Sequence, residues 1–337
     1  MTRFSTFTND ETNIEESSVN VFKKRIKIND TKHIDFFCPN EMTSSRVNII
    51  FSKEPETIEW IDSFENNSVF WDIGANIGNY SLYAALVNNS KVFAFEPAAS
   101  NYFCLCKNIE LNKLDKQIFP LCVSFSGHTK IASLNMVSTE YGSANNEFDY
   151  EKNDIGEYPD FIFQQSSIGF TINDFIKIYN PSLPNHLKID VDGIESLIIK
   201  ESNTLLSYKN LYDVSIEINE NDQNVCKTIT NIMNEFGFSL KQKKHAAIFD
   251  QTLHSTVFNF LFSRWKNYII QSKYVDDMTS NILFIVIDSL RANYCYDHKK
   301  SYSTPNLDQI IKKGTYFTES ITCADGTGLV LGSIFTG

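Results

Sequence analysis

The segment Val69–Tyr80 has the residue types and spacing of a ligand-binding loop. An apolar run ends in Asp72, and small residues then lead into a predicted helix. Gly74 allows the backbone to approach a ligand closely, and Gly78 allows the following helix to pack tightly on its strand. Asn76 occupies the position between these glycines, and its polar side chain is not what a pyrophosphate requires. The loop therefore indicates a nucleoside ligand without a pyrophosphate.

A second acid follows the next apolar run of the chain. Lys91–Phe95 has the pattern of a buried strand and is followed by Glu96 and Pro97. In nucleoside-binding half-sheets, an acid at this position accepts hydrogen bonds from ribose hydroxyls. A glycine-rich turn without a ligand is the alternative, but the presence of Glu96 favours a binding site. The loop and Glu96 together have the pattern of proteins that bind S-adenosylmethionine.

A further group of ionisable residues surrounds the end of another apolar run. Lys188, Asp190 and Asp192 alternate along the chain, and a regular strand would place all three on one side. Gly193 then turns the chain into a predicted helix whose first turn contains Glu195. Carboxylates that are crowded in a cleft raise one another's pKa, which suits a general base. They could instead bind a divalent cation or form a solvated surface cluster, but the strongly apolar neighbours favour a functional site.

The elements that position these residues alternate between strand and helix. Strands are predicted at Ser68–Trp71, Lys91–Phe95, Gln117–Val123, Ile131–Met136, His186–Val191, Asp213–Ile218 and Val257–Ser263. Helices are predicted after Glu54 and at Gly78–Val87, Ser100–Leu111, Thr171–Tyr179, Glu195–Leu206 and Val225–Phe236. This alternation predicts an α/β fold with a doubly wound, mostly parallel, Rossmann-like sheet. Such sheets bind ligands at the carboxyl ends of their strands, where Asp72, Glu96 and Asp190 are all expected to lie.

The chain is predicted to have four parts. Residues 1–45 form a polar N-terminal extension with short strands at Val21–Ile28 and His33–Phe37, residues 46–265 form the α/β domain, and residues 266–280 form a linker. Residues 281–337 begin a partial second α/β segment. Within the α/β domain, the polar stretch Val137–Pro159 is predicted to be a loop over the site.

Composition and charge exclude several classes of protein. A hydrophobic fraction of 42% in 337 residues supports a substantial core. The net charge of -11 argues against a nucleic-acid partner, because phosphate contacts require clustered Lys and Arg. The seven cysteines lack zinc-finger spacing and are interpreted as reduced thiols. Neither a secretion signal nor a membrane-spanning run is found, so the sequence predicts a cytoplasmic protein; it indicates no oligomeric state.

Residues from Ser52 to Ser263 resemble the FkbM family of S-adenosylmethionine-dependent methyltransferases. The resemblance is carried by Glu54–Thr57 with Trp60, Phe70–Ser81, Val92–Pro97, Asn108, Ile109, Asn112, Leu187–Glu195, Glu217 and Asn259–Phe262. The family usually has Glu at the position of Asp192. The resemblance implies methyl transfer to a hydroxyl oxygen, commonly on a sugar of a glycan or of a secondary metabolite.

The resemblance also implies roles for individual residues. The expected donor-binding residues are Asp72, Gly74, Ala75, Asn76, Gly78, Asn79, Glu96 and Pro97. Among these, Glu96 would bind the ribose and Asp72 would lie beneath the methionine end. The expected catalytic residues are Lys188, Asp190, Asp192, Glu195 and Glu217. Asp190, Asp192 and Glu195 would face the acceptor with one of them as the base, and Glu217 could orient the acceptor. His245 and His254 are weaker candidates for the base. The sequence leaves the acceptor, the base and a divalent metal open.

The segment after residue 280 resembles the start of a sulfatase domain of the alkaline-phosphatase-like superfamily. The resemblance is carried by Asn281–Ala292, Thr304–Asp308, Gly314–Phe317 and Gly332–Gly337. In that superfamily a strand-end acid, here Asp288, binds a divalent metal, and Thr327 stands at the position of the nucleophile. The Cys-x-Pro-x-Arg motif and the downstream metal ligands are missing, so this segment is predicted to be truncated or vestigial.

The sequence therefore leaves three functions open. The first is an O-methyltransferase that acts on a sugar or glycan precursor. The second is a bifunctional parent protein whose C-terminal domain is a metal-dependent sulfatase or phospho-transferase. The third is a scaffold that binds the cofactor without catalysis. Transfer of a labelled methyl group separates the first function from the third.

Overall fold

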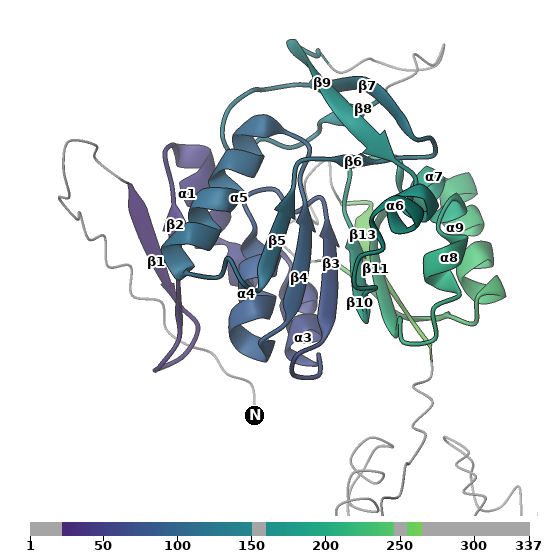
Figure 1. Cartoon of the computed structure of the whole chain (residues 1–337), viewed down its shortest axis with the longest axis horizontal. Helices are drawn as coiled ribbons and strands as arrows, with labels where there is room; N and C mark the ends of the chain where they lie inside the picture. Colours follow the sequence, from purple (N-terminus) through teal and green to yellow (C-terminus); the bar gives the residue numbers. More distant parts are fainter. Residues whose placement is uncertain (1–21, 150–159, 246–254, 265–337) are drawn as a thin grey trace, which may run out of the picture. The chain divides into compact units, whose positions relative to one another are not determined.

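The computed structural model describes residues 22–149, 160–245 and 255–264 (Figure 1). The chain divides into two units, residues 1–268 and 269–337, and every described residue belongs to the first. The predicted linker and the sulfatase-like segment, with Asp288 and Thr327, lie outside the described residues. The described helices include none that is long and apolar enough to cross a membrane.

A seven-stranded sheet forms the centre of the first unit, in the order β12, β13, β11, β10, β3, β4, β5. Its strands are β3 (Val69–Ile73), β4 (Lys91–Phe95), β5 (Ile118–Leu121), β10 (His186–Ile189), β11 (Asp213–Asn219), β12 (Ser239–Lys244) and β13 (Val257–Ser263). The strands from β11 to β5 run parallel, and β13 is antiparallel to both of its neighbours. The predicted doubly wound, mostly parallel sheet of the Rossmann-like type is therefore confirmed.

The central strands are buried on both faces. Within β3, Phe70 belongs to one hydrophobic core and Trp71 to the other. The first core includes residues of α3 (Pro55–Asp62), α4 (Asn79–Asn88) and α5 (Ala99–Asn112). The second includes residues of α6 (Ile172–Tyr179), α7 (Glu195–Lys200), α8 (Asn203–Leu206) and α9 (Gln223–Glu235). The two groups of helices lie on opposite sides of the sheet in Figure 1. Burial on both faces explains why these strands are nearly continuous apolar runs.

Several helices begin where the sequence signals a start. α4 begins after Gly78, whose φ of +91° disfavours any side chain. Pro55 is the first residue of α3, where its missing N–H costs nothing. The Thr171 hydroxyl caps α6 by accepting a hydrogen bond from the Asp174 amide at 3.0 Å. These local signals place the helices that follow the strands.

One predicted helix is wrong in its bounds, and one strand was not predicted. The helix predicted at Glu195–Leu206 is broken into α7 and α8. The Ser202 hydroxyl donates to the Ile198 carbonyl at 2.6 Å, and this kind of bond often bends a helix. The strand that was not predicted is β12, which pairs with β13 at the edge of the sheet. β12 is exposed along most of its length, so it lacks the apolar alternation that would have predicted a strand.

The N-terminal segment packs against the first group of helices. β1 (Lys23–Lys27) and β2 (His33–Phe37) form the expected short strands, and they pair antiparallel. Two helices that the sequence did not predict, α1 (Glu41–Asn48) and α2 (Ile50–Lys53), connect this pair to α3. A small sheet in the order β6, β9, β7, β8 lies beyond the carboxyl ends of the central strands in Figure 1. Its strands are β6 (Ser124–Phe125), β7 (Lys130–Met136), β8 (Glu147–Phe148) and β9 (Phe163–Phe170).

Candidate active site

A cavity of about 360 Å³ lies at the carboxyl ends of the central strands, which is within the range of small-molecule sites. The predicted site residues that line it are Gly74, Asn76, Glu96, Pro97, Asp190, Asp192 and Glu217. The segment before β3 contributes Arg46, Lys53, Glu54 and Glu56, and the loop after β7 contributes Ser143, Ala144, Asn145 and Asn146. The two predicted groups of residues therefore share one cavity.

The loop that follows β3 packs directly against the end of β10. The amides of Gly74 and Ala75 donate to the Phe95 carbonyl at 2.9 and 3.0 Å. Gly74 has a φ of +89°, and a Cβ atom there would lie 1.8 Å from the carbonyl oxygen of Asp190. Both the backbone conformation and this close approach require glycine. This loop, residues 74–78, is called the β3 loop below.

Glu96 is held in the wall of the cavity by backbone amides. Its Oε2 accepts from the Asn76 amide at 2.8 Å, and its Oε1 accepts from the Ala98 amide at 2.9 Å. Burial raises the pKa of Glu96 to about 7, although the two amides favour the charged form. The Asn76 side chain donates to the Ser143 carbonyl at 2.8 Å, which fixes the β3 loop beside Glu96. Each carboxylate oxygen has two lone pairs, so Glu96 can accept further hydrogen bonds from a ligand.

Four residues that the sequence predicted for the donor site lie behind the cavity and not in its lining. They are Asp72, Ala75, Gly78 and Asn79. Asp72 is buried within β3 and accepts from the Ser81 hydroxyl at 2.6 Å. Burial raises the pKa of Asp72 to about 6. The Asn79 side chain donates to the Arg46 carbonyl at 3.2 Å. Ala75 and Gly78 belong to the β3 loop itself, while Asp72 precedes it in β3 and Asn79 follows it as the first residue of α4.

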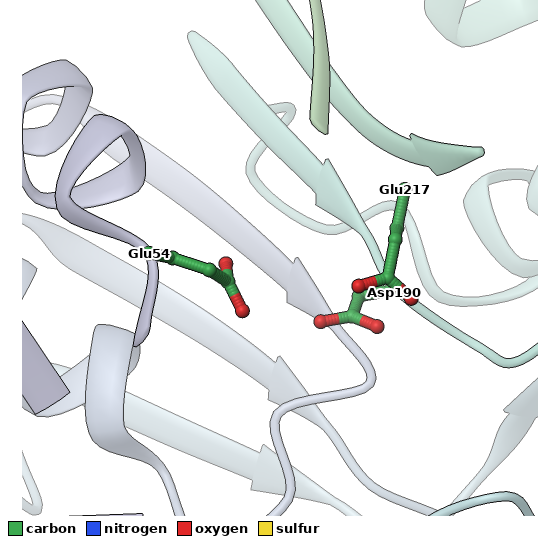
Figure 2. Close-up of side chains that lie close together, drawn as sticks. All are labelled: Glu54, Asp190 and Glu217. Carbon is green, nitrogen blue, oxygen red and sulfur yellow. The ribbon is translucent and has the colours of Figure 1, made fainter. Parts of the chain in front are cut away.

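Three carboxylates converge on another part of the cavity (Figure 2). Glu54, Asp190 and Glu217 each have an oxygen atom within 4.8 Å of the others, and they are called the carboxylate cluster below. The Lys188 ammonium is 2.5 Å from Asp190 and 3.8 Å from Glu54, and the Lys53 ammonium is 2.9 Å from Glu54. Among the described residues, Glu217 forms neither a hydrogen bond nor an ion pair through its side chain. Two lysines therefore compensate two of the three carboxylates.

Burial and the neighbouring charges shift the pKa values in the cluster in opposite directions. Burial alone would raise the pKa of Glu54, but Lys53 and Lys188 outweigh it and hold that pKa well below its ordinary value. Burial opposes the charge of Lys188, yet the carboxylates of Asp190 and Glu54 raise its pKa. Burial also raises the pKa of Glu217 well above its ordinary value, and the charges of Asp190 and Glu54 raise it further. Glu217 therefore binds a proton far more readily than an exposed glutamate does.

The common orientation expected for Lys188, Asp190 and Asp192 is not found. β10 ends at Ile189, and Asp192 has a left-handed φ of +60°, so strand alternation stops before it. Lys188 is fully buried beneath the cavity, while Asp192 lines it. Asp192 accepts from the Asn145 amide at 2.8 Å, and burial together with the charge of Asp190 raises its pKa. Of the predicted group, Asp190 and Asp192 therefore line the cavity, whereas Lys188 is buried and does not line it.

Glu195 closes its own turn and does not line the cavity. Its Oε1 accepts from the Gly193 amide at 3.1 Å and from the Val191 amide at 3.4 Å. Burial raises the pKa of Glu195 to about 7. The geometry gives Glu195 a structural role at the start of α7 and places it away from a ligand.

The sequence predicted a loop at Val137–Pro159. The part of it that the structure describes contributes Ser143–Asn146 to the lining of the cavity. The Ser143 carbonyl accepts from the side-chain amides of Asn76 and Asn101, at 2.8 and 3.0 Å. The Asn145 amide bonds to Asp192 on the far side of the cavity. The loop is therefore attached both to the β3 loop and to the end of β10.

One of the two histidines that the sequence suggested as weaker bases lies at the cavity. His245 is in the lining, with its ring stacked on Phe258 at a centroid distance of 4.2 Å. Its Nδ1 lies 3.1 Å from the Val257 carbonyl oxygen. His254 lies outside the described residues. These contacts hold the imidazole ring of His245 in the cavity lining.

The sequence did not identify Glu54 or Lys53 as site residues. Glu54 was recognised as the residue before a helix and as part of a motif that carries the family resemblance, but no role in the site was assigned to it, and only 3% of its side chain is exposed. No local pattern indicates that this residue lies beside a distant strand. Asn259 was likewise unassigned; its Nδ2 donates to Glu56 at 2.9 Å, and its buried Oδ1 has no partner among the described residues.

The carboxylate cluster has the ligand type that divalent cations prefer, because it presents three carboxylate oxygens. Lys53 and Lys188 already supply two positive charges at this position. The raised pKa of Glu217 further reduces the negative charge of the cluster. Charge compensation at the cluster is therefore provided by the chain itself.

The sheet order and the acid-lined cavity at its carboxyl edge define a Rossmann-like enzyme of the α/β class. The family model of the methyltransferase FkbM domain matches residues 72–240 of the 337, and the chain belongs to this family. The predicted family and the predicted methyltransferase activity are therefore confirmed. No curated protein matches the chain significantly.

Solved methyltransferase structures resemble this chain at low identity. The precorrin-6y C5,15-methyltransferase of Geobacter metallireducens shares 12% identity at a TM-score of 0.36, over 63% of this chain and 87% of that one. TYW2 of M. jannaschii, solved in complex with AdoMet, shares 11% identity at a TM-score of 0.37, over 74% and 90%. At 11–12% identity, these structures indicate neither the acceptor nor the catalytic residues of this chain.

Proposed function

We propose that the protein is an S-adenosylmethionine-dependent O-methyltransferase whose acceptor is a hydroxyl of a sugar or glycan precursor. The observation that carries this proposal is Glu96, a buried carboxylate that two backbone amides hold in the cavity wall beside the β3 loop. A carboxylate in this position can accept hydrogen bonds from the two ribose hydroxyls of an adenosyl group. Membership of a methyltransferase family supports a methyl donor as the ligand.

The residues around Glu96 fit such a donor. Gly74 and Asn76 line the cavity next to it, and the close packing of Gly74 on Asp190 fixes the β3 loop there. When bound, S-adenosylmethionine supplies a methyl group on a positively charged sulfur, which makes that methyl carbon electrophilic. Asp190 and Asp192 line the same cavity, so its charge suits a cation.

The lining opposite Glu96 is rich in hydrogen-bond acceptors. It includes the carboxylate cluster, Glu56 and Asn259, whose Oδ1 has no partner among the described residues. Hydroxyl groups are the donors that such a surface can bind, whereas a phosphate or carboxylate group would find few donors there apart from Arg46 and Lys53. These contacts support a neutral polyhydroxyl acceptor, such as an uncharged sugar.

The chain has three tasks in this reaction. It must hold the acceptor hydroxyl in line with the methyl group, exclude water and take up the hydroxyl proton. The loop that contains Ser143 covers the cavity and is anchored to both of its sides. The carboxylate cluster supplies the groups that can orient a hydroxyl and accept its proton.

Replacement of Glu96 by Gln tests the donor site. The variant keeps the size of the side chain, removes its charge and places an NH₂ group against one of the two backbone amides. Calorimetric titration with S-adenosylmethionine at pH 8.5 should show affinity reduced about 10- to 100-fold, because a hydrogen bond to a charged group contributes about 1.5–3 kcal/mol. Glu110→Gln, on an exposed residue of α5, is the matched control and should bind as the wild type does. Unchanged affinity of Glu96→Gln would refute the donor site.

A panel of hydroxyl compounds tests the acceptor class. The protein is incubated with labelled donor and with neutral glycosides, amino sugars or sugar nucleotides, and mass spectrometry detects the gain of one methyl group. Neutral glycosides are expected to be methylated fastest. Preference for sugar nucleotides would contradict a neutral acceptor, and donor binding without methyl transfer to any compound would favour the non-catalytic scaffold.

A further inference from the structure

We propose that Glu217 is the base that takes the proton from the acceptor hydroxyl, and that Glu54 is a positioning residue that acts on Glu217 through its nearby charge. The proposal rests on the proposed function, because it assigns a role within the same cavity. It differs from the expectation from the sequence, which looked for the base among Asp190, Asp192 and Glu195 and gave Glu217 only the orientation of the acceptor. It also gives a role to Glu54, which the sequence did not place at the site.

The other candidate carboxylates are engaged by the protein itself. Asp190 is bound to the Lys188 ammonium at 2.5 Å, and Asp192 accepts from the Asn145 amide at 2.8 Å. Glu195 accepts from two backbone amides and lies outside the cavity lining. Bonds of this kind stabilise the charged carboxylate and occupy its oxygen atoms, although burial still raises the pKa of Asp192 and Glu195.

Glu217 has the position and the freedom that a base requires. It lies near the end of β11, lines the cavity and is partly exposed to it. Its carboxylate forms no hydrogen bond or ion pair with the residues that the structure describes. Burial raises its pKa well above the ordinary value, and a base works best when its pKa is near the working pH.

The charges around Glu217 come from two other elements. Lys188 and Asp190 belong to β10 and its end, and Lys53 and Glu54 belong to the link between α2 and α3. Asp190 and Glu54 raise the pKa of Glu217, whereas Lys53 and Lys188 lower it. The other titratable groups that line the same cavity are Arg46, Glu56, Glu96, Asp192 and His245. Loss of the Glu54 charge alone would leave the two lysines in place and lower the pKa of Glu217.

The step balances with the acceptor and a sulfonium methyl donor as its only other participants. The acceptor oxygen forms a bond to the methyl carbon while the bond from that carbon to sulfur breaks, and the electron pair of the broken bond stays on sulfur. The hydroxyl proton passes to a carboxylate oxygen of Glu217. Glu217 later releases this proton to water, which restores the base.

A titration of the full-length protein tests the proposal without an acceptor. Glutamate is labelled with ¹³C at the carboxyl carbon, and the Glu217 signal is assigned by its loss in Glu217→Gln. The signal should titrate well above the pH at which exposed glutamates titrate, and it should move to lower pH in Glu54→Gln. An ordinary titration of Glu217, or no shift in Glu54→Gln, would overturn the proposal.

Kinetics provide the second test, with the glycoside that gains a methyl group fastest in the panel. Glu217→Gln should lower kcat by about 10²- to 10³-fold, a typical loss for a general base, with donor affinity within about threefold of wild type. Glu220→Gln is the matched control, because Glu220 follows the same strand but pairs with Lys243 outside the cavity lining. Glu54→Gln should shift the acidic limb of the kcat profile to lower pH.

The outcomes separate this proposal from the proposed function. Retained turnover in Glu217→Gln, with a large loss in Asp190→Asn, would overturn Glu217 as the base while leaving the methyltransferase proposal intact. Failure of the wild-type protein to bind the donor would refute the proposed function. The ¹³C titration would still test, independently of that result, whether the pKa of Glu217 is raised and depends on Glu54. Thermal unfolding of each variant confirms that the measured protein is folded.

Discussion

The close approach of Gly74 to Asp190 makes a sharp prediction for the substitution Gly74→Ala. The added Cβ would lie 1.8 Å from the Asp190 carbonyl oxygen, whereas real Cβ contacts essentially never fall under 3.0 Å. The two backbones must therefore separate by at least 1.2 Å (3.0 − 1.8). The Asp190 amide also donates to the Ile73 carbonyl at 3.0 Å, and this separation would weaken that bond.

Gly237 is a matched control for this substitution. It has a φ of +79°, close to the +89° of Gly74, but a Cβ atom there would meet no atom within 4 Å. Both substitutions bear the cost of a left-handed alanine, about 1–2 kcal/mol, partly offset by about 0.4–1 kcal/mol from the stiffer unfolded chain. Only Gly74→Ala adds overpacking of about 1–3 kcal/mol and a weakened hydrogen bond of about 0.5–1.5 kcal/mol. Gly74→Ala should therefore be less stable than Gly237→Ala by about 2–4 kcal/mol.

Urea unfolding of both full-length variants measures this difference in the free energy of unfolding. Calorimetric titration with S-adenosylmethionine, at a temperature where both variants are folded, should show a large loss of affinity in Gly74→Ala alone. The reason is that the β3 loop must move in that variant, whereas Gly237 is not part of the cavity lining. Equal stability of the two variants would refute the contact between the β3 loop and β10.

Two further predictions concern pH and metals. Burial raises the pKa of Glu96 and of Glu195 to about 7 and that of Asp72 to about 6, so the folded protein favours the protonated carboxyls. Each pKa unit corresponds to about 1.4 kcal/mol. The free energy of unfolding, measured by urea unfolding, should therefore fall by a few kcal/mol between pH 5 and 8. A rise in the urea midpoint over that range would contradict this prediction. Chelation with EDTA should leave the initial rate of methyl transfer unchanged, because Lys53 and Lys188 compensate the negative charge of the carboxylate cluster. Loss of activity that Mg²⁺ restores would show that a metal is required.

Features that depend on short segments could be predicted from the sequence. The apolar run before Asp72, the glycines of the β3 loop and the strand before Glu96 follow from local spacing, because a parallel strand, a tight turn and a helix start each have a local pattern. The helix predicted at Thr171–Tyr179 is found as α6 (Ile172–Tyr179) for the same reason, with Thr171 as its cap. Parallel pairing of these strands then brings their carboxyl ends, and so Glu96 and Asp190, to one cavity.

Features that depend on distant contacts could not be predicted. Glu54 reaches the cluster because the segment before α3 packs across the ends of β10 and β11, and no residue near Glu54 encodes that contact. The turn at Glu195 depends on which backbone amides face its carboxylate, which spacing alone does not determine. The side chain of Asp192 does not follow the strand alternation expected from Lys188 and Asp190, because its backbone is left-handed.

The cavity extends beyond the segment that the family model matches. Arg46, Lys53, Glu54 and Glu56 precede residue 72, and His245, Val257 and Asn259 follow residue 240. The matched segment therefore supplies the proposed donor-binding residues together with Asp190, Asp192 and Glu217, while the flanking segments supply further lining residues. On the proposed function, replacing the stretch before β3 by that of a relative would alter the lining near the carboxylate cluster while Gly74, Asn76 and Glu96 stay in place, so that stretch is a target for engineering acceptor preference.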